Sequence, residues 1–166
     1  TILKSEMTIE LEELYVKGLK EAINKGYKIL SNGGSAIDAV EKSVIVLENN
    51  PLFNAGKGSV FNHKGQHEMD ASIMDGSSLN AGSVCCVQKF KNPISLARMV
   101  MEKSEHVMLT GNGANDFGTS LGIEKMKDSY FFDQFRYNQW QEIKDTDNFQ
   151  LDHSKKIQKN LVQLAR

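Results

Sequence analysis

Residues 49–76 combine glycines, amides, acids and two histidines, the residue types from which many active sites are built. His63 and His67 offer ligand nitrogens, and the carboxylates of Glu68 and Asp70 follow them directly. A structural metal site of this kind needs four such ligands in a tetrahedral arrangement. A hairpin here would separate the histidines across its turn, and no second ligand pair completes the set. The pattern therefore favours solvated turn residues over a metal centre.

An acid and base pair is the second chemistry that this stretch suggests, from Asp70 and Asp75. Their odd spacing on a strand directs the two carboxylates to opposite faces unless a bulge intervenes. Asp75 also precedes Gly76, which is typical of a turn residue. We therefore do not expect the two aspartates to act together.

Cys85 and Cys86 are the only cysteines in the chain. Adjacent residues on a strand point to opposite faces, so we expect no ordinary disulfide between them. Cysteines in such positions are more often small hydrophobic residues than nucleophiles. Two cysteines without a disulfide fit a reducing compartment.

Two glycine-rich stretches invite a phosphate-binding interpretation. In residues 109–116 two glycines follow an expected strand, but Asp116 stands where a dinucleotide fingerprint has its third glycine, and its charge opposes a pyrophosphate. Residues 56–59 have the residue types of a phosphate loop in the wrong order and spacing. Nucleotide binding is therefore not expected at either stretch.

Hydrophobic periodicity predicts the elements that position these residues. Residues 8–32 indicate a long amphipathic helix that ends at Gly33 and Gly34. Its periodic apolar residues are Leu11, Leu14, Tyr15, Leu19, Ala22, Ile23, Tyr27 and Leu30. Ser35 and Asp38 have the spacing of a capping box for a second helix. The side chains expected to face inward from that helix are Ile37, Val40, Val44 and Leu47.

Beyond Pro51 the period changes to two, which predicts strands. Residues 69–73 and 79–87 are expected to pair as antiparallel strands through a turn at residues 75–78. Residues 59–62 are expected to form a third strand. Small and apolar residues on both faces of the second strand indicate a sheet that is covered on both sides.

The remaining chain predicts more helix and a tail. A helix is expected from Pro93 to about Ser104, then a short strand at residues 107–110 and a further helix from Asn112. Aromatic residues cluster at positions 128–144, where packing is the expected role. Residues 145–166 are rich in charged and amide side chains, so we expect a flexible linker or tail there.

The composition limits the partners of this chain. Its 166 residues carry 20 Lys and Arg against 21 Asp and Glu, a formal net charge of -1, without the basic stripe that nucleic-acid binding needs. No run approaches the roughly 18 apolar residues of a membrane span, and the first residues lack the order of a signal peptide. We therefore expect a soluble cytoplasmic protein that binds neither nucleic acid nor membrane.

Several motifs carry a family resemblance. NPLFNAGKGSVF at residues 50–61 and EMDASIMDG at residues 68–76 together resemble the signature of the plant-type asparaginases, the isoaspartyl peptidases. The resemblance continues through LNAGSV at residues 79–84, through residues 92–114 and through IQKNL at residues 157–161. It therefore covers nearly the whole chain.

Members of that family are N-terminal nucleophile hydrolases, α+β proteins with a four-layer αββα sandwich, whose precursor cuts itself before a threonine. The resemblance implies that this chain is the alpha subunit, with residues 1–144 as its part of a single domain. The nucleophilic threonine would begin a separate beta subunit and use its own amine as base, so no catalytic residue is expected in this chain. The implied substrates are L-asparagine and beta-aspartyl peptides, and the implied assembly has two alpha and two beta subunits.

The resemblance also implies a structural sodium or potassium ion and no organic cofactor. Such hard cations prefer oxygen ligands, which main-chain carbonyls supply whatever the side chain. The matching positions are Leu47, Glu48, Asn50, Phe53, Ala55 and Lys57. Asn54, in the same loop, matches a position at the edge of the active site, where its amide contacts substrate or an ordered water. Capping the turn is its alternative role.

Two departures from the family pattern leave alternatives open. The family opens with a strand ending in a His-Gly-Gly-Ala-Gly turn, which would precede Thr1, so Thr1 is not expected to be the nucleophile. After Leu161 the family continues Gly-Thr-Val-Gly, where this sequence has residues 162–166. The alternatives are a glycosylasparaginase of the same superfamily and a non-catalytic relative that acts as an interaction module. The motif LFNAGKGSVF favours the plant-type branch.

Overall fold

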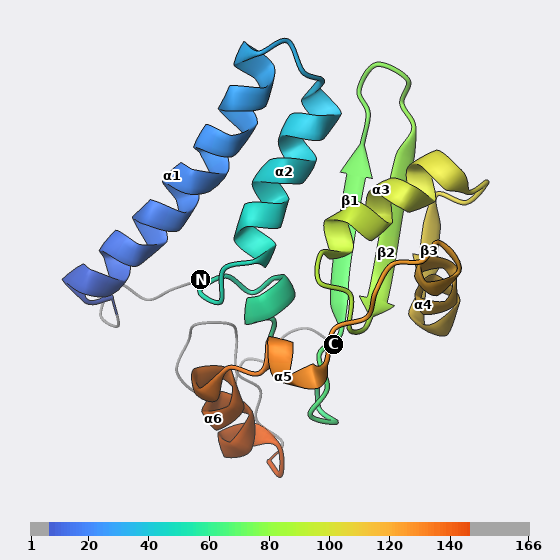
Figure 1. Cartoon of the computed structure of the whole chain (residues 1–166). Coiled ribbons are helices and arrows are strands. Elements are labelled where there is room, and N and C mark those ends of the chain that lie inside the picture. Colours follow the sequence, from blue (N-terminus) through green and yellow to red (C-terminus); the bar gives the residue numbers. More distant parts are fainter. Residues whose placement is uncertain (1–6, 147–166) are drawn as a thin grey trace, which may run out of the picture.

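The computed structural model describes residues 7–146, which form a helical pair, a small sheet and the helices around it (Figure 1). Helix α1 (Ile9–Ser31) starts at Thr8, whose side chain accepts the N–H of Leu11. Just beyond its end, Gly33 adopts a φ of 78°. Helix α2 (Ala36–Glu48) starts at Ser35, whose Oγ accepts the N–H of Asp38 and donates to its carboxylate. Both predicted helices and the capping box are confirmed.

Small residues, and not the predicted apolar stripe, join α1 to α2. Gly18, Ala22 and Gly26 are the buried residues of α1. A Cβ added at Gly26 would press on Ser43 and on the carbonyl of Ala39, so the two helices approach closely there. The large residues Leu14, Leu19, Ile23, Tyr27 and Leu30 stay exposed, and so does Val40 of α2, against the sequence prediction.

The sheet contains the predicted hairpin and, as its third strand, the short strand predicted at residues 107–110. Strands β1 (Met69–Met74) and β2 (Ala81–Val87) are antiparallel, β3 (Met108–Thr110) runs parallel to β2, and the order is β1-β2-β3. The predicted strand at residues 59–62 was wrong. Asn62 folds the following residues into a turn, because its side chain accepts the N–H groups of Lys64 and Gln66.

A β-bulge interrupts the pairing of β1 with β2. Asp70 of β1 lies opposite two residues of β2, Cys85 and Cys86, and Cys86 has a φ of 55°. Because of the extra residue, Val84 and Val87 both point into the core, whereas Cys85 is half-buried and Cys86 exposed. The expectation that the cysteines point to opposite faces was therefore wrong, although both are free thiols as expected.

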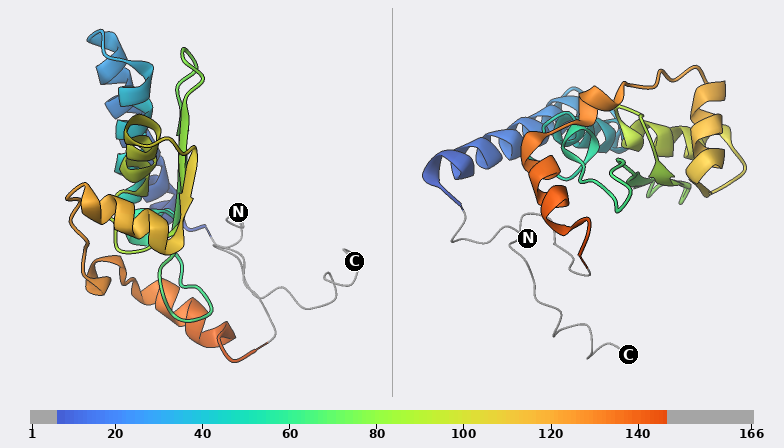
Figure 2. Two further views of the ribbon diagram at one scale, coloured as in Figure 1. Left: turned by 90° about the vertical axis from the view of Figure 1, so that its right-hand side faces the viewer. Right: turned by 90° about the horizontal axis from the view of Figure 1, so that it is seen from below.

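The core lies between the sheet and helix α3 (Pro93–Lys103), which crosses one face of the sheet (Figure 1). Helix α4 (Gly111–Ser120) lies on the same side, as the left view of Figure 2 shows. On the other face, Asp70, Ser72 and Met74 of β1 are exposed. Within residues 7–146 the fold is thus a mixed helix and sheet arrangement with one covered sheet face, not the two that the sequence suggested.

Two short helices end the described chain. They are α5 (Asp128–Phe131) and α6 (Gln134–Ile143). The rings of Phe132, between the two helices, and of Tyr137 and Trp140 in α6 pack against Phe61, in agreement with the predicted packing role. The predicted tail, residues 145–166, lies outside the described residues after its second position, so its boundary stays a prediction. No described helix has the length and apolar character to cross a membrane.

Candidate functional site

The predicted cation loop leads from the last turn of α2 into a single 3-10 turn, η2 (Gly56–Gly58). Internal hydrogen bonds fold it on itself: the carbonyls of Leu47, Asn50 and Ala55 accept N–H groups from within the loop at 3.1, 3.3 and 3.1 Å. A carbonyl oxygen has two lone pairs, so each of these groups retains acceptor capacity. The six predicted ligand positions therefore lie on one compact loop.

Two glycines allow this loop to close. Gly56 has a φ of 52°, and a Cβ there would collide with the carbonyl of Glu48. A Cβ at Gly58 would collide with the carbonyls of Pro51 and Phe53. Several carbonyl oxygens thus face the interior of the loop at points where only glycine fits.

Neighbouring elements hold the loop in place. Tyr15 of α1 donates from its hydroxyl to the carbonyl of Leu52 at 2.8 Å. Asn92, the residue before α3, donates to the side chain of Asn49 at 3.2 Å, and the hydroxyl of Tyr130 in α5 donates to the same oxygen at 3.4 Å. The loop is therefore braced by contacts from three helical regions that lie far apart in the sequence.

The buried side chain of Glu48 connects the end of α2 to the start of α3, a role that the sequence did not predict. Its carboxylate accepts the N–H of Ile94 at 2.9 Å and the side-chain amide of Asn92 at 3.0 Å, so it lies at the N-terminus of α3. Burial raises the pKa of Glu48 to about 7 in spite of these hydrogen bonds. An acid at the last residue of a helix, where the helix dipole disfavours it, is the signal that could have indicated such a partner.

A second polar network ties α2 to α3 behind the loop. Arg98 donates to the carboxylates of Asp38 at 2.6 Å, Glu41 at 2.8 Å and Glu102 at 2.6 Å. Glu41 also accepts the hydroxyl of Ser95 at 2.6 Å. Burial acts to raise the pKa of Glu41, but the hydrogen bonds from Ser95 and Arg98 hold it below its usual value. The end of α2, from which the loop departs, is thereby fixed relative to α3.

Asn54 is exposed on the outside of this loop. Its Oδ1 accepts the N–H of Val60 at 3.0 Å, so the alternative role of capping the turn is realised. Within residues 7–146 its amide nitrogen has no hydrogen-bond partner. The side chain is thus held by its oxygen and presents two N–H donors to solvent or to a ligand.

Ser59 and His67 resemble a nucleophile and its base, but their geometry does not support that role. Nδ1 of His67 lies 3.1 Å from both the hydroxyl and the carbonyl oxygen of Ser59. A carbonyl can only accept, so Nδ1 carries a proton and cannot take one from the hydroxyl. Burial lowers the pKa of His67, and its ring packs 4.2 Å from that of Phe61. His67 is therefore not the solvated turn residue that the sequence suggested, whereas His63 is exposed as expected.

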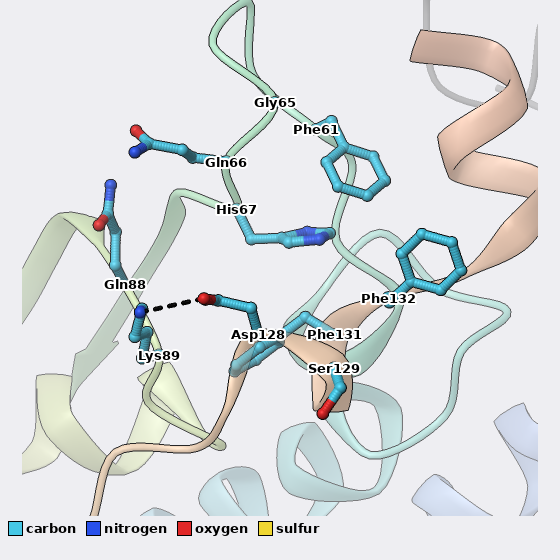
Figure 3. A pocket seen from close by; sticks show the side chains of 10 residues that line it. All are labelled: Phe61, Gly65, Gln66, His67, Gln88, Lys89, Asp128, Ser129, Phe131 and Phe132. Carbon is cyan, nitrogen blue, oxygen red and sulfur yellow. Dashed lines mark hydrogen bonds and ion pairs between the residues drawn. The ribbon is translucent and has the colours of Figure 1, made fainter. Parts of the chain in front are cut away.

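A pocket of about 510 Å³ lies beside His67 (Figure 3). The rings of Phe61, Phe131 and Phe132 line it, and the ion pair between Lys89 and Asp128, 3.1 Å long, closes another side. Its lining residues offer apolar surface and charge but no hydroxyl or thiol paired with an available base. The pocket is therefore not a candidate centre for hydrolysis.

Potential metal ligands come together at a different place. Among the described residues, three groups within reach of one ion are Asp70, Cys85 and Cys86, and neither His63 nor His67 joins them. The interpretation of the histidines as a metal pair is thus excluded by their positions.

The glycine loop and the hairpin that follows it lie within a match to a known family: the chain belongs to the asparaginase family, whose model matches residues 1–165. The chain is 45% identical over 152 residues to a putative isoaspartyl peptidase/L-asparaginase of Dictyostelium discoideum, which covers 92% of this chain and 44% of that protein. It is 53% identical over 122 residues to the isoaspartyl peptidase/L-asparaginase of Mus musculus, and the match covers 74% of this chain and 37% of that protein. It is 40% identical over 153 residues to the isoaspartyl peptidase of Escherichia coli (strain K12), and the match covers 92% of this chain and 48% of that protein. The chain thus spans less than half the length of these relatives.

Proposed function

We propose that this protein is the alpha subunit of an amidohydrolase that cleaves L-asparagine and beta-aspartyl peptides. The observation that carries the proposal is the braced glycine loop at residues 49–58, in a chain that matches the asparaginase family over residues 1–165. The relatives named above are isoaspartyl peptidases and L-asparaginases, which supports the same chemistry here.

In this proposal the nucleophile is a threonine that begins a separate beta subunit and uses its own amine as base. The alpha subunit contributes a positioned donor beside the reacting carbonyl. Asn54 suits this role, because its oxygen is held by Val60 and its N–H groups are available. A donor that is fixed before the reaction stabilises the negative charge of a tetrahedral intermediate without reorganisation.

Uncovered surfaces of the chain support a partner. On α1, Ile23 is 69% and Tyr27 68% exposed, and they continue a row of exposed apolar residues. Such a contiguous apolar surface marks an interaction site. The open face of the sheet is a second such surface. We assign both to contacts with the beta subunit and a second alpha-beta pair, which would complete a four-layer αββα sandwich.

We place a sodium or potassium ion in the glycine loop. The main-chain carbonyls of Leu47, Glu48, Asn50, Phe53, Ala55 and Lys57 would hold it, and hard oxygen donors are what these cations prefer. The support from the structure is the crowding of carbonyls against Gly56 and Gly58. The ion would add positive charge inside the loop and fix the backbone that carries Asn54. The free thiols of Cys85 and Cys86 fit the cytoplasmic location that we also propose.

The decisive experiment asks whether the purified protein contains a second chain that begins with threonine. Intact-mass measurement and N-terminal sequencing identify such a chain, and its absence, with no hydrolysis of any substrate, would leave only a non-catalytic relative. Hydrolysis rates for asparagine, a beta-aspartyl dipeptide and glycosylated asparagine then separate the proposed activity from that of a glycosylasparaginase.

A matched pair of variants tests the role of Asn54. Asn54→Asp keeps an oxygen that accepts the N–H of Val60 but removes the free N–H groups, whereas Asn54→Ala removes both. We expect Asn54→Asp to lower kcat/KM by about tenfold or more with little change in thermal stability, because one charge-assisted hydrogen bond contributes about 1.5–3 kcal/mol. Undiminished kcat/KM in both variants would contradict the substrate-binding role.

A further inference from the structure

The imidazole of His67 lies against the segment that holds Asn54. Its Nδ1 is 3.1 Å from the carbonyl oxygen of Ser59, and the hydroxyl oxygen of Ser59 lies at the same distance. Ser59 is buried, with 3% of its surface exposed. The N–H of the next residue, Val60, donates to Oδ1 of Asn54 at 3.0 Å. The carbonyl of Ser59 and the N–H of Val60 belong to one peptide group, so His67 and Asn54 bind the two sides of the same group.

This peptide group transmits orientation from one residue to the other. Its atoms are planar and trans, so the C=O and the N–H point in opposite directions and turn together. Ser59 has a ψ of 144°, in the broad extended region that leaves the following peptide group free to rotate over tens of degrees. The local backbone thus sets the direction of the Val60 N–H only loosely, and the hydrogen bond from His67 restricts it.

Neighbouring rings hold His67 in this position. The centroid of its ring lies 4.2 Å from that of Phe61 and 5.8 Å from that of Phe131, and Figure 3 shows the three side chains beside one another in the pocket wall. Burial lowers the pKa of His67, although hydrogen bonds to the backbone act to raise it. The ring is therefore neutral near pH 7, and its single proton is on Nδ1, because only a donor can bind a carbonyl.

Hydrogen bonds that form a chain strengthen one another. A donor at the carbonyl of a peptide group polarises the N–H of that group, and an N–H bound to an amide oxygen polarises the N–H groups of that amide in turn. The chain that starts at Nδ1 of His67 ends at the N–H groups of Asn54, which have no partner within residues 7–146. These are the donors that the proposed function directs at the reacting carbonyl.

We propose that His67 is a positioning residue for the hydrolytic reaction. It fixes the peptide group between Ser59 and Val60, and through that group the direction and strength of the donor that Asn54 presents. His67 neither touches the substrate nor takes a proton from it. This inference rests on the proposed function, because it requires Asn54 to act on the reacting carbonyl. The hydrogen bonds that carry it are all made within this chain.

Three variants of the purified protein separate the hydrogen bond from the packing of the ring. His67→Phe keeps an aromatic ring beside Phe61 but has no donor. We expect kcat and kcat/KM to fall equally, about three- to tenfold, because an interaction with the transition state alone is weakened. His67→Asn has a side-chain N–H near the position of Nδ1 and should recover most of kcat. His63→Phe, at the exposed histidine of the preceding turn, should leave kcat as it is.

A double variant tests whether His67 acts through Asn54. Asn54→Asp lacks the amide donors, so His67→Phe added to it should lower kcat by less than about twofold further, the non-additivity expected of coupled residues. An equal loss in both backgrounds would overturn the inference. Undiminished kcat in His67→Phe alone would also overturn it.

Hydrogen exchange gives a readout that does not need hydrolysis. The amide of Val60 should exchange at least about threefold faster in His67→Phe than in His67→Asn or the unchanged protein, at similar thermal stability, because its N–H is held less firmly. Equal exchange rates would overturn the positioning role even if kcat fell. A protein that hydrolyses no substrate would instead overturn the proposed function, and the exchange rates alone would then decide whether His67 positions Asn54.

Discussion

Helices α1 and α3 follow the same amphipathic pattern, yet the structure treats their apolar faces in opposite ways. Helix α3 buries its apolar side against the sheet, with Pro93, Ile94, Leu96, Ala97 and Val100 as its buried residues. Helix α1 buries Gly18, Ala22 and Gly26, and its larger apolar residues stay exposed. Periodicity thus identifies a helix but does not decide which of its faces meets a neighbour.

The reason for the difference is the neighbour. A sheet offers a broad apolar surface, so α3 packs its large side chains into it. Helix α2 and the glycine loop instead approach α1 so closely that a Cβ at Gly18 would press on Asn50 and Phe53. The large residues of α1 therefore stay exposed, which is why we assign this face to an interface.

The largest effect expected from this comparison concerns Leu96 on α3, which is 1% exposed. Leu96→Ala should lower the free energy of unfolding by about 2–5 kcal/mol, because it removes buried methyl groups and leaves a cavity. Leu19→Ala on α1, where the side chain is 46% exposed, should cost less than about 1 kcal/mol in the chain measured alone. Urea denaturation measures both, and equal losses would contradict the contrast.

The next effect concerns Glu48 at the N-terminus of α3. Its folded pKa, about 7, lies above the ordinary value of 4.5, so the folded state retains the proton longer as pH rises. The stability that Glu48 contributes is therefore full below pH 4.5 and lost as the pH rises through 7. Relative to Glu48→Gln, the protein should lose about 3 kcal/mol between these limits, since each pKa unit corresponds to about 1.4 kcal/mol.

Glu41, which like Glu48 belongs to α2, is the control for this pH dependence. Burial opposes its ionisation, but hydrogen bonds from Ser95 and Arg98 lower its pKa overall, so its contribution is present at neutral pH and lost on acidification. Glu41→Gln should therefore change the pH profile with the opposite sign. Profiles of the same sign for the two variants would contradict the assigned environments.

A smaller effect is expected at the glycines of α1. Gly26→Ala should lower the free energy of unfolding by about 1–3 kcal/mol, because the new methyl group presses on Ser43 and on the backbone of Ala39. In the matched change Gly113→Ala, in α4, the new methyl group has no neighbour within 4 Å. This change should raise the free energy of unfolding by up to about 1 kcal/mol. Thermal unfolding of the two variants measures the difference in sign. Stabilisation by both changes would contradict the close approach of α1 and α2 at Gly26.

The smallest effect on the chain itself is expected for Ile23 on the exposed face of α1. Ile23→Ser should change the free energy of unfolding of the isolated chain by less than about 0.5 kcal/mol. In the assembled protein it should weaken association by about tenfold or more, as loss of a central apolar contact does. Analytical ultracentrifugation measures the assembly, with Lys25→Ser on the opposite side of α1 as control. Unchanged association would move the interface away from this face.

Local signals were sufficient for much of the fold and for the position of the glycine loop. The capping box at Ser35 and the turn at Asp75 are each made by residues within a few positions of one another, and both were predicted. The strand at residues 59–62 was not predicted correctly, because Asn62 supplies a turn that competes with strand pairing. The side-chain role of Glu48 depends on α3, 46 positions away in sequence, and so had no local signal beyond its place at a helix end.

By itself the sequence determined where α1 and α3 begin and end and where α2 begins, because caps and periodicity act over one or two turns of chain. Its linked motifs also indicated the asparaginase family that the comparison confirms. Only the tertiary structure decided which face of α1 is buried and that both cysteines share one face. The second result depends on the bulge, which a hydrogen bond between Asp70 and Cys86, 16 positions apart, holds in place. Such contacts form between segments that meet only in the folded chain, and no local pattern specifies them.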